Sequence, residues 1–427
     1  MTSSSDELAR RLTTTDAVVI GLGAMIGAGV FAAPGPAAEA AGSWLLVSLA
    51  IAALVAYANA TSSAQLAALY PESGGTYVYA RRRLGAYWGF LAGWSFVVGK
   101  TASLAAMALT FGAYLSEDLA RPIAIGAVVA MAAVNYRGVT RTVRLTRVLL
   151  ALVLATLSVV VAASLLGDSA RLANLDLALP AGPYGVVQAA ALLFFAFAGY
   201  ARLATLGEEV VDPETTIPRA IPIALGIVVA VYALVLTALL LALGPETLAA
   251  STAPLADAVV AGGWAGLAPV VRIGAAIAAG GVLLSLLAGI SRTSLAMARR
   301  RELPGVLDAV HPRYRSPYRA EVAVAVVVSG ILLVADLRGA IGFSSFAVLT
   351  YYALANASAW RLDADERRWP RGLAGLGVVL CVALAFTLPL VAVVGGLALL
   401  VVGSLLWLAT RGRREPPGPT APRPMGP

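Results

Sequence analysis

The chain has 427 residues, of which 59% are hydrophobic and 13% charged, with a net charge of +8, whereas a soluble domain has about 45–50% apolar and 25% charged residues. Because the sequence holds one cysteine and one histidine, a disulfide framework, a Cys/His metal site and most cysteine or histidine catalysis are excluded. Apolar stretches of about 20 residues recur from end to end, so we expect a polytopic membrane protein without a separate soluble domain.

Apolar windows bounded by charged residues, glycine and proline predict an all-α fold with twelve transmembrane helices. The predicted spans cover residues 16–38, 43–69, 84–115, 121–136, 141–167, 184–207, 218–244, 268–298, 320–336, 339–360, 372–390 and 392–410. Residues 1–410 would therefore form a single transmembrane domain. The proline-rich residues 411–427 predict a disordered cytoplasmic tail.

Four glycines interrupt the first predicted span in the stretch GLGAMIGAGVF, residues 21–31. They do not form a dinucleotide-binding fingerprint, because Ile26 takes the third glycine's place and no acidic residue follows about 20 positions on. A break at Gly27, Ala28 and Gly29 would free backbone amides of a half-helix whose positive dipole end suits a substrate carboxylate. The alternative is close helix packing through small residues four positions apart.

Lys100 is the only lysine of the chain and lies within the third predicted span, 17 residues from Arg83 and 17 from Glu117. Either distance is about 25 Å along a helix, too far for the side chain to reach an interface. We expect Lys100 to face the interior, as a titrating group or as a fixed cation that meets an anionic substrate. The alternative is a structural ion pair with another span.

A second interruption lies five spans after the first, in the stretch FFAFAGY, residues 194–200. Two broken spans at corresponding positions of two five-span halves predict an inverted-repeat transporter whose site lies where both helices unwind. The repeats would cover about residues 16–167 and 184–360, followed by two further helices over about 372–410.

Arg202 follows this second interruption and is six residues from Glu208. It would either contact the substrate or pair with Glu208 or Glu209 at the cytoplasmic edge. Those two glutamates, close to Arg219, are candidates for a gate, with a solvated loop as the alternative. If Lys100 and Arg202 both face the cavity, a polyamine or other net-cationic substrate is disfavoured, because like charges would meet in a low dielectric.

The basic residues outside the spans fall almost entirely on one side, 24 against 3, and four more lie within or at the edge of spans. This asymmetry places both termini in the cytoplasm of a multi-pass protein of the plasma (inner) membrane. It also explains the net positive charge without nucleic-acid binding.

Other classes of protein fit the sequence less well. An enzyme is not expected, because no histidine, cysteine or acidic pair lies at membrane depth, and a channel would show a repeated filter or a ring of like charge. Hydroxyls in the eighth span are candidates for a sodium site, although such groups more commonly bond to their own helix: Ser285, Ser291 and Thr293. We predict no metal and no cofactor.

Four motifs in this order resemble the amino acid-polyamine-organocation (APC) superfamily, which has a LeuT-like fold, and the resemblance covers nearly the whole chain. The motifs are LTTTDAVVIGLGAMIGAGVF (12–31), YPESGGTYVYARRRLG (70–85), GEEVVDPETTIPRAIP (207–222) and GISRTSLAMARRRELP (289–304). The resemblance implies a secondary active transporter for amino acids or related small organic solutes, working by alternating access and coupled to protons or run as exchange. An organic amine or carboxylate transporter and a transport-dead solute sensor are the alternatives on this fold.

The resemblance also implies roles for individual residues. Thr15 or Asp16 would cap the first helix. Lys100 falls where members often carry a tyrosine near the substrate, whereas proton-coupled members with a lysine have it in the fifth span, at the place of Val153. The first break gives the substrate-binding candidates Ile26, Gly27, Ala28 and Gly29. The second break, where the substrate side chain would lie, gives Phe197, Ala198, Gly199 and Tyr200.

Overall fold

A computed structural model describes residues 12–27, 29–71, 74–138, 143–175, 181–204 and 209–410, and in this part of the chain the only non-helical pairing is one isolated β-bridge. The longer helices are α1 (Thr14–Met25), α4 (Leu45–Leu69), α6 (Ala86–Leu115), α7 (Ala120–Tyr136), α8 (Val143–Leu166), α9 (Gly182–Phe197), α11 (Pro213–Ala250), α13 (Ala268–Arg299), α14 (Tyr318–Val334), α15 (Leu337–Trp360), α16 (Arg371–Thr387) and α17 (Leu390–Thr410). The shorter α-helices are α2 (Gly29–Ala32), α3 (Pro34–Ala41), α5 (Thr76–Arg83), α10 (Ala201–Ala204) and α12 (Pro254–Ala261). The 3₁₀ turns are η1 (Gly42–Trp44), η2 (Leu172–Asn174), η3 (Ala198–Tyr200), η4 (Ala265–Leu267) and η5 (Gly305–Leu307).

Within the described residues, nine helical stretches are long and apolar enough to cross a membrane. Two further apolar helices, α7 and α16, have 17 residues each, which is about 25 Å and near the lower limit for a span. Each predicted span contains an α-helix. The predicted class, an all-α multi-pass membrane protein, is therefore confirmed.

Several predicted boundaries are wrong. The first span does not run to residue 38, because α2 ends at Ala32 and Pro34 starts the separate helix α3, where a missing N–H has no cost in the first turn. Helix α11 runs beyond its predicted range and bends at Gly244, whose φ is 71°. The connecting helices α5 and α12 are not among the predicted elements. Residues 411–427, the predicted tail, lie outside the described part.

The cap of the first helix also differs from expectation. Thr13, rather than Thr15 or Asp16, is the N-cap of α1: its hydroxyl accepts a hydrogen bond from the Asp16 N–H at 3.3 Å. The Asp16 carboxylate accepts in turn from the Thr13 N–H at 3.1 Å, which completes a capping box. Just before this cap, Leu12 pairs with Val210 in the β-bridge, so the start of α1 is tied to the segment that precedes α11.

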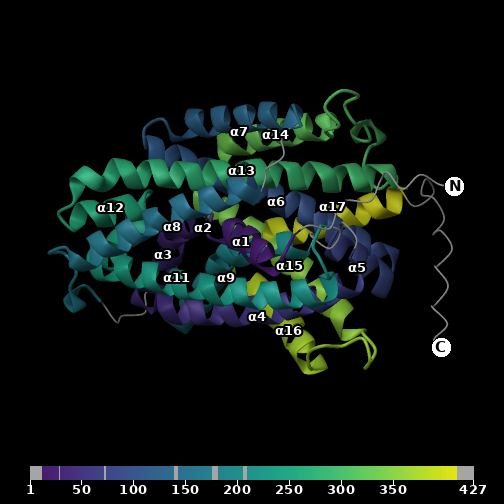
Figure 1. The fold of residues 1–427 in the computed structure, drawn as a ribbon, viewed down its shortest axis with the longest axis horizontal. Helices are drawn as coiled ribbons and strands as arrows, with labels where there is room; N and C mark the ends of the chain where they lie inside the picture. Colours follow the sequence, from purple (N-terminus) through teal and green to yellow (C-terminus); the bar gives the residue numbers. More distant parts are fainter. Residues whose placement is uncertain are drawn as a thin grey trace.

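The interrupted helices lie in the middle of the bundle. Helices α1, α2 and α9 run between α13 on one side and α4 on the other (Figure 1). Helix α1 packs against α11, α8 and the turn η3, and α6 packs extensively on α15 and α13. Irregular backbone at membrane depth is tolerated only where protein or an internal cavity surrounds it. The fold supplies this environment for both interruptions.

Candidate functional site

The first interruption separates α1 from α2. Helix α1 ends at Met25, Ile26 is its C-cap, and α2 resumes at Gly29. The side chain of Ile26 is fully buried and Gly27 is buried beside it. Ala28 lies outside the described residues.

The second interruption is milder than a full break. After α9 ends at Phe197, the turn η3 (Ala198–Tyr200) carries the chain as a 3₁₀ helix into the short α10. A 3₁₀ stretch inside a helix often marks a hinge or a strained sequence. Phe197, Ala198 and Tyr200 are buried, and Gly199 is partly buried.

The two interruptions touch each other through their glycines. A Cβ on Gly29 would lie 2.6 Å from the Cα of Ala196 near the end of α9. A Cβ on Gly199 would overlap the carbonyl of Ala24 near the end of α1. Glycine is therefore required in each segment so that the backbone of the other can approach. The structure brings together the two breaks that the sequence places more than 160 residues apart.

Tyr232 of α11 joins the same two helix ends, and the sequence reading missed it. Its hydroxyl lies 2.5 Å from the Met25 carbonyl oxygen and 3.0 Å from that of Ala196. Its ring lies 5.2 Å from the ring of Phe197. The last carbonyls of a helix have no partner within that helix, and here two of them share the single O–H of a tyrosine from α11. A lone tyrosine within an apolar span was the available signal, because a buried hydroxyl needs a partner.

Lys100 of α6 reaches the second interruption. Its side chain is 7% exposed, and its amine donates a hydrogen bond to the Ala198 carbonyl at 3.2 Å. The Tyr352 hydroxyl donates to the same oxygen at 3.3 Å. Because the C-terminal end of a helix carries partial negative charge, the end of α9 is a favourable partner for an ammonium group. Lys100 thus lies in the interior, at the turn where the second candidate segment begins.

The ring of Tyr352 from α15 packs against aromatic rings of α9 and of this turn. The rings of Tyr200 and Tyr352 stack with centroids 4.8 Å apart, and Phe194 meets Tyr352 edge-on at 5.8 Å. The candidates Phe197 and Tyr200 are thus packed against tyrosines of other helices. Tyr352, like Tyr232, is a residue of the site that the sequence reading did not single out.

A small cavity lies on the other side of the first interruption. It has a volume of about 20 Å³ and lies between α1, α8 and α13, with Ile26, Gly27, Val153 and Val282 in its lining. A volume of that size admits about one water molecule. Val153, the position that the resemblance pairs with a lysine of proton-coupled members, is therefore close to the first interruption.

Arg202 does not join this group. Its guanidinium lies 3.8 Å from the Glu209 carboxylate, and the two side chains are 45% and 39% exposed. Ion pairs this exposed contribute little to stability. Glu208, the other gate candidate, lies outside the described residues.

Three ion pairs at the arginine-rich end of the bundle were not predicted. Arg81 of α5 pairs with Glu302, whose side chain is 1% exposed and also accepts from the Tyr77 hydroxyl at 2.7 Å. Burial raises the pKa of Tyr77, and the adjacent Glu302 carboxylate adds to this effect. The other two pairs are Arg83 with Glu366 and Arg147 with Asp16. Burial would raise the pKa of Glu366, but the hydrogen bond and charge of Arg83 together with the hydrogen bond from the Asp363 N–H hold that pKa below its ordinary value.

The hydroxyls considered for sodium do not converge. Ser285 is exposed, Ser291 is fully buried, and Thr293 donates to the Gly289 carbonyl of its own helix at 3.0 Å. Among the described residues no group of three or more His, Cys, Asp or Glu side chains is arranged to hold a metal ion.

Two interrupted membrane helices that meet in the interior of a helical bundle are an arrangement typical of multi-pass transporters. The family model described as amino acid permease matches residues 12–415. The chain belongs to this family of the APC superfamily, as its motifs indicated.

Relatives at several distances carry transporter names. An uncharacterized transporter of Mycobacterium tuberculosis is 60% identical over 398 residues, covering 93% of this chain and 90% of the relative. A branched-chain amino acid permease of Bacillus subtilis is 25% identical over 95% of this chain and 94% of its own. A chloroplastic cationic amino acid transporter of Arabidopsis thaliana is 30% identical over 84% of this chain and 66% of the relative. The protein is therefore a solute transporter and not an enzyme.

Proposed function

We propose that this permease carries a neutral or anionic amino-acid-like solute, bound where the two interrupted helices meet. The observation that carries the proposal is the hydrogen bond from the Lys100 amine to the Ala198 carbonyl. A carbonyl at an interrupted helix is the kind of group that would accept a substrate ammonium. Here the protein supplies a cation of its own, so a second cationic side chain on the substrate would meet like charge in a low dielectric.

In the proposed complex the backbone of the first interruption, from Ile26 through Gly27 and Ala28 to Gly29, holds the substrate carboxylate. The second interruption, with Ala198, Gly199 and the rings of Phe197 and Tyr200, faces the substrate side chain. This assignment is supported by the contact between the two segments at Gly29 and Gly199.

The proposed cycle is alternating access by two five-span repeats of a twelve-span bundle in the plasma membrane, with both termini in the cytoplasm. The cavity beside the first interruption holds about one water, so the helices must separate to admit a solute there. The pair of Arg147 with Asp16 and the bridge of Leu12 with Val210 both hold the start of α1. We assign the cytoplasmic gate to these contacts, with Glu209 and Arg202 beside them.

Lys100 would couple transport in one of two ways, by releasing a proton during the cycle or by remaining a fixed cation for an anionic substrate. Counterflow in proteoliposomes, with leucine, glutamate and arginine as probes, tests both the charge class and the coupling. We expect leucine or glutamate to exchange and arginine to fail. Lys100→Met should lower counterflow about tenfold or more, because a hydrogen bond to a charged group contributes about 1.5–3 kcal/mol.

Two control variants separate the roles of Lys100. Lys100→Arg keeps the charge, so it should retain part of the exchange if Lys100 is a fixed cation and lose its pH dependence if Lys100 titrates. Arg121→Gln removes an exposed cation that contacts neither the site nor the gate, since its guanidinium donates to the Leu333 carbonyl, and should leave exchange near its original level. Normal exchange by Lys100→Met, or exchange of arginine alone, would overturn the proposal. Solute binding without any counterflow would identify a sensor instead.

A further inference from the structure

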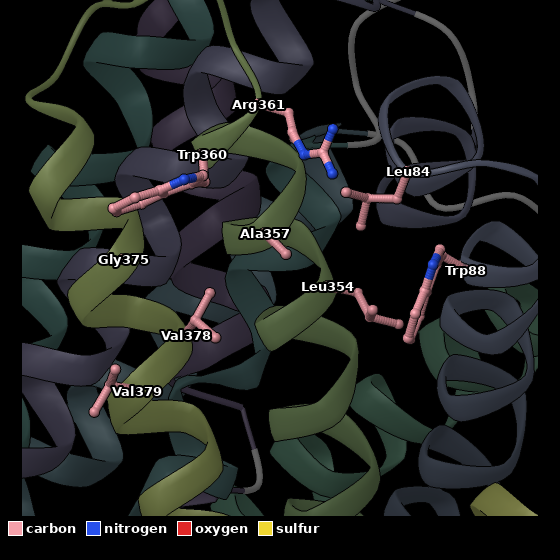
Figure 2. A pocket seen from close by; sticks show the side chains of 9 residues that line it. All are labelled: Leu84, Trp88, Leu354, Ala357, Trp360, Arg361, Gly375, Val378 and Val379. Carbon is pink, nitrogen blue, oxygen red and sulfur yellow. The ribbon is translucent and has the colours of Figure 1, made fainter.

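A groove of about 470 Å³ opens on the outer face of the bundle, between the start of α6, the C-terminal end of α15 and the first turns of α16. Trp88 and Leu354 flank it on one side, and Val378 and Val379 of α16 line the other (Figure 2). Trp88 is 43% exposed and Val379 is 64% exposed. In a chain that spans a membrane, an exposed apolar face meets lipid, so the natural content of this groove is hydrocarbon.

The groove owes its shape to a missing side chain. A Cβ on Gly375 of α16 would overlap the ring of Trp360, so the glycine lets the indole lie directly against α16. The guanidinium of Arg371 lies 4.7 Å from the centroid of the Trp360 ring. Tryptophan and arginine together at a helix end are typical of the level of lipid headgroups.

One end of the groove carries positive charge. Arg361, the C-cap residue of α15, extends its guanidinium over the opening toward Leu84 (Figure 2). In the described part of the chain, that guanidinium has no hydrogen bond or ion pair. Glu366 of the same connection pairs with Arg83 and not with Arg361. This end is also the one with the arginine-rich connections of the chain.

We infer that the groove is a binding site for an anionic phospholipid, with an acyl chain between Trp88 and Val379 and the headgroup phosphate on Arg361. Basic pockets between membrane helices at the headgroup level bind anionic lipids in this way, and one arginine near such a surface favours them about fivefold. The inference depends on the membrane location of the chain and not on the solute that it carries.

Tryptophan fluorescence tests this site directly, because bromine on an acyl chain quenches an indole that it touches. The purified protein is reconstituted in phosphatidylcholine containing either brominated phosphatidylglycerol or brominated phosphatidylcholine. We expect stronger quenching by phosphatidylglycerol, with a local preference of about fivefold. The excess should disappear in the Trp88→Phe, Trp360→Phe double variant, which leaves five of the seven tryptophans as a reference.

The matched pair Arg361→Gln and Arg367→Gln assigns the headgroup contact. Arg367 lies in the same connection, but its Nε donates to the Asp363 carbonyl at 3.2 Å and it does not line the groove. We expect Arg361→Gln to lose the phosphatidylglycerol preference and Arg367→Gln to keep it. Equal quenching by the two lipids, or a preference that survives in Arg361→Gln, would overturn the inference. If the protein is a dimer and neither lipid quenches Trp88 or Trp360, the groove is instead covered by a second copy of the chain.

Discussion

The two helix interruptions at the centre of this permease are built in different ways. The first is a gap in the helix at Ile26 and Gly27, and the Met25 carbonyl at its start receives one side-chain donor, Tyr232 of α11. The second is a 3₁₀ turn, Ala198–Tyr200, whose leading carbonyl receives donors from two other helices, Lys100 of α6 and Tyr352 of α15. The Met25 carbonyl therefore has one side-chain donor, whereas the Ala198 carbonyl has two.

This difference predicts which amino-acid substitutions each interruption tolerates. Backbone that lies against backbone cannot yield, whereas a side chain at the end of a contact can rotate away. A carbonyl with two donors loses less from the removal of one donor than a carbonyl with a single donor. The two interruptions should therefore respond differently to substitutions of the same size.

The largest effect is expected at Gly199. A methyl group there would meet the carbonyl of Ala24 in α1, which is backbone and cannot rotate aside. We expect Gly199→Ala to destabilise the fold by about 3 kcal/mol, at the upper end of overpacking costs, and to abolish counterflow. Thermal unfolding of the purified protein and exchange in proteoliposomes would measure both effects.

Gly226→Ala is the matched control for that change. Gly226 lies in α11, and no packing neighbour lies within 4 Å of the position that an added methyl group would take. Alanine is also favoured over glycine in a helix by about 1 kcal/mol. The variant should unfold at the original temperature or slightly above. If Gly199→Ala unfolds at the same temperature as Gly226→Ala, the tight backbone contact between the two interruptions is absent.

A smaller effect is expected at Tyr232, whose hydroxyl serves the carbonyls of Met25 and Ala196. Tyr232→Phe leaves both carbonyls buried without this donor and should cost about 1–2 kcal/mol. Tyr352→Phe keeps the hydrogen bond from Lys100 to the Ala198 carbonyl. It should therefore lower the free energy of unfolding by only about 0.5 kcal/mol. Thermal unfolding of the two variants would rank them, and equal losses would contradict the argument from shared donors.

Much of this architecture is predictable from sequence, because it depends on local patterns. Apolar windows predict the helices, the glycines mark the first interruption, and the central place of Lys100 in its span indicates an interior position. The partners are not predictable in the same way. Arg81 and Glu302 are 221 residues apart, and no local pattern says which buried charges or hydroxyls meet. The end of the first span was also predicted wrongly, because the apolar window continues past Pro34, where a new helix begins.

A smaller loss of stability than at Gly199 or Tyr232 is expected at Gly27, and this variant separates packing from solute binding. A methyl on Gly27 would overlap Cγ2 of Val282, a partly buried side chain that borders the cavity of about 20 Å³, and would lie 3.3 Å from the Gly23 carbonyl oxygen. Because the valine can turn into that space, Gly27→Ala should cost less than about 1 kcal/mol. If the first interruption holds the substrate carboxylate, however, counterflow should still fall sharply, because a methyl group would occupy space that the solute needs. Unfolding near the original temperature together with lost exchange would assign Gly27 to the solute, whereas unchanged exchange would mean that the solute binds elsewhere.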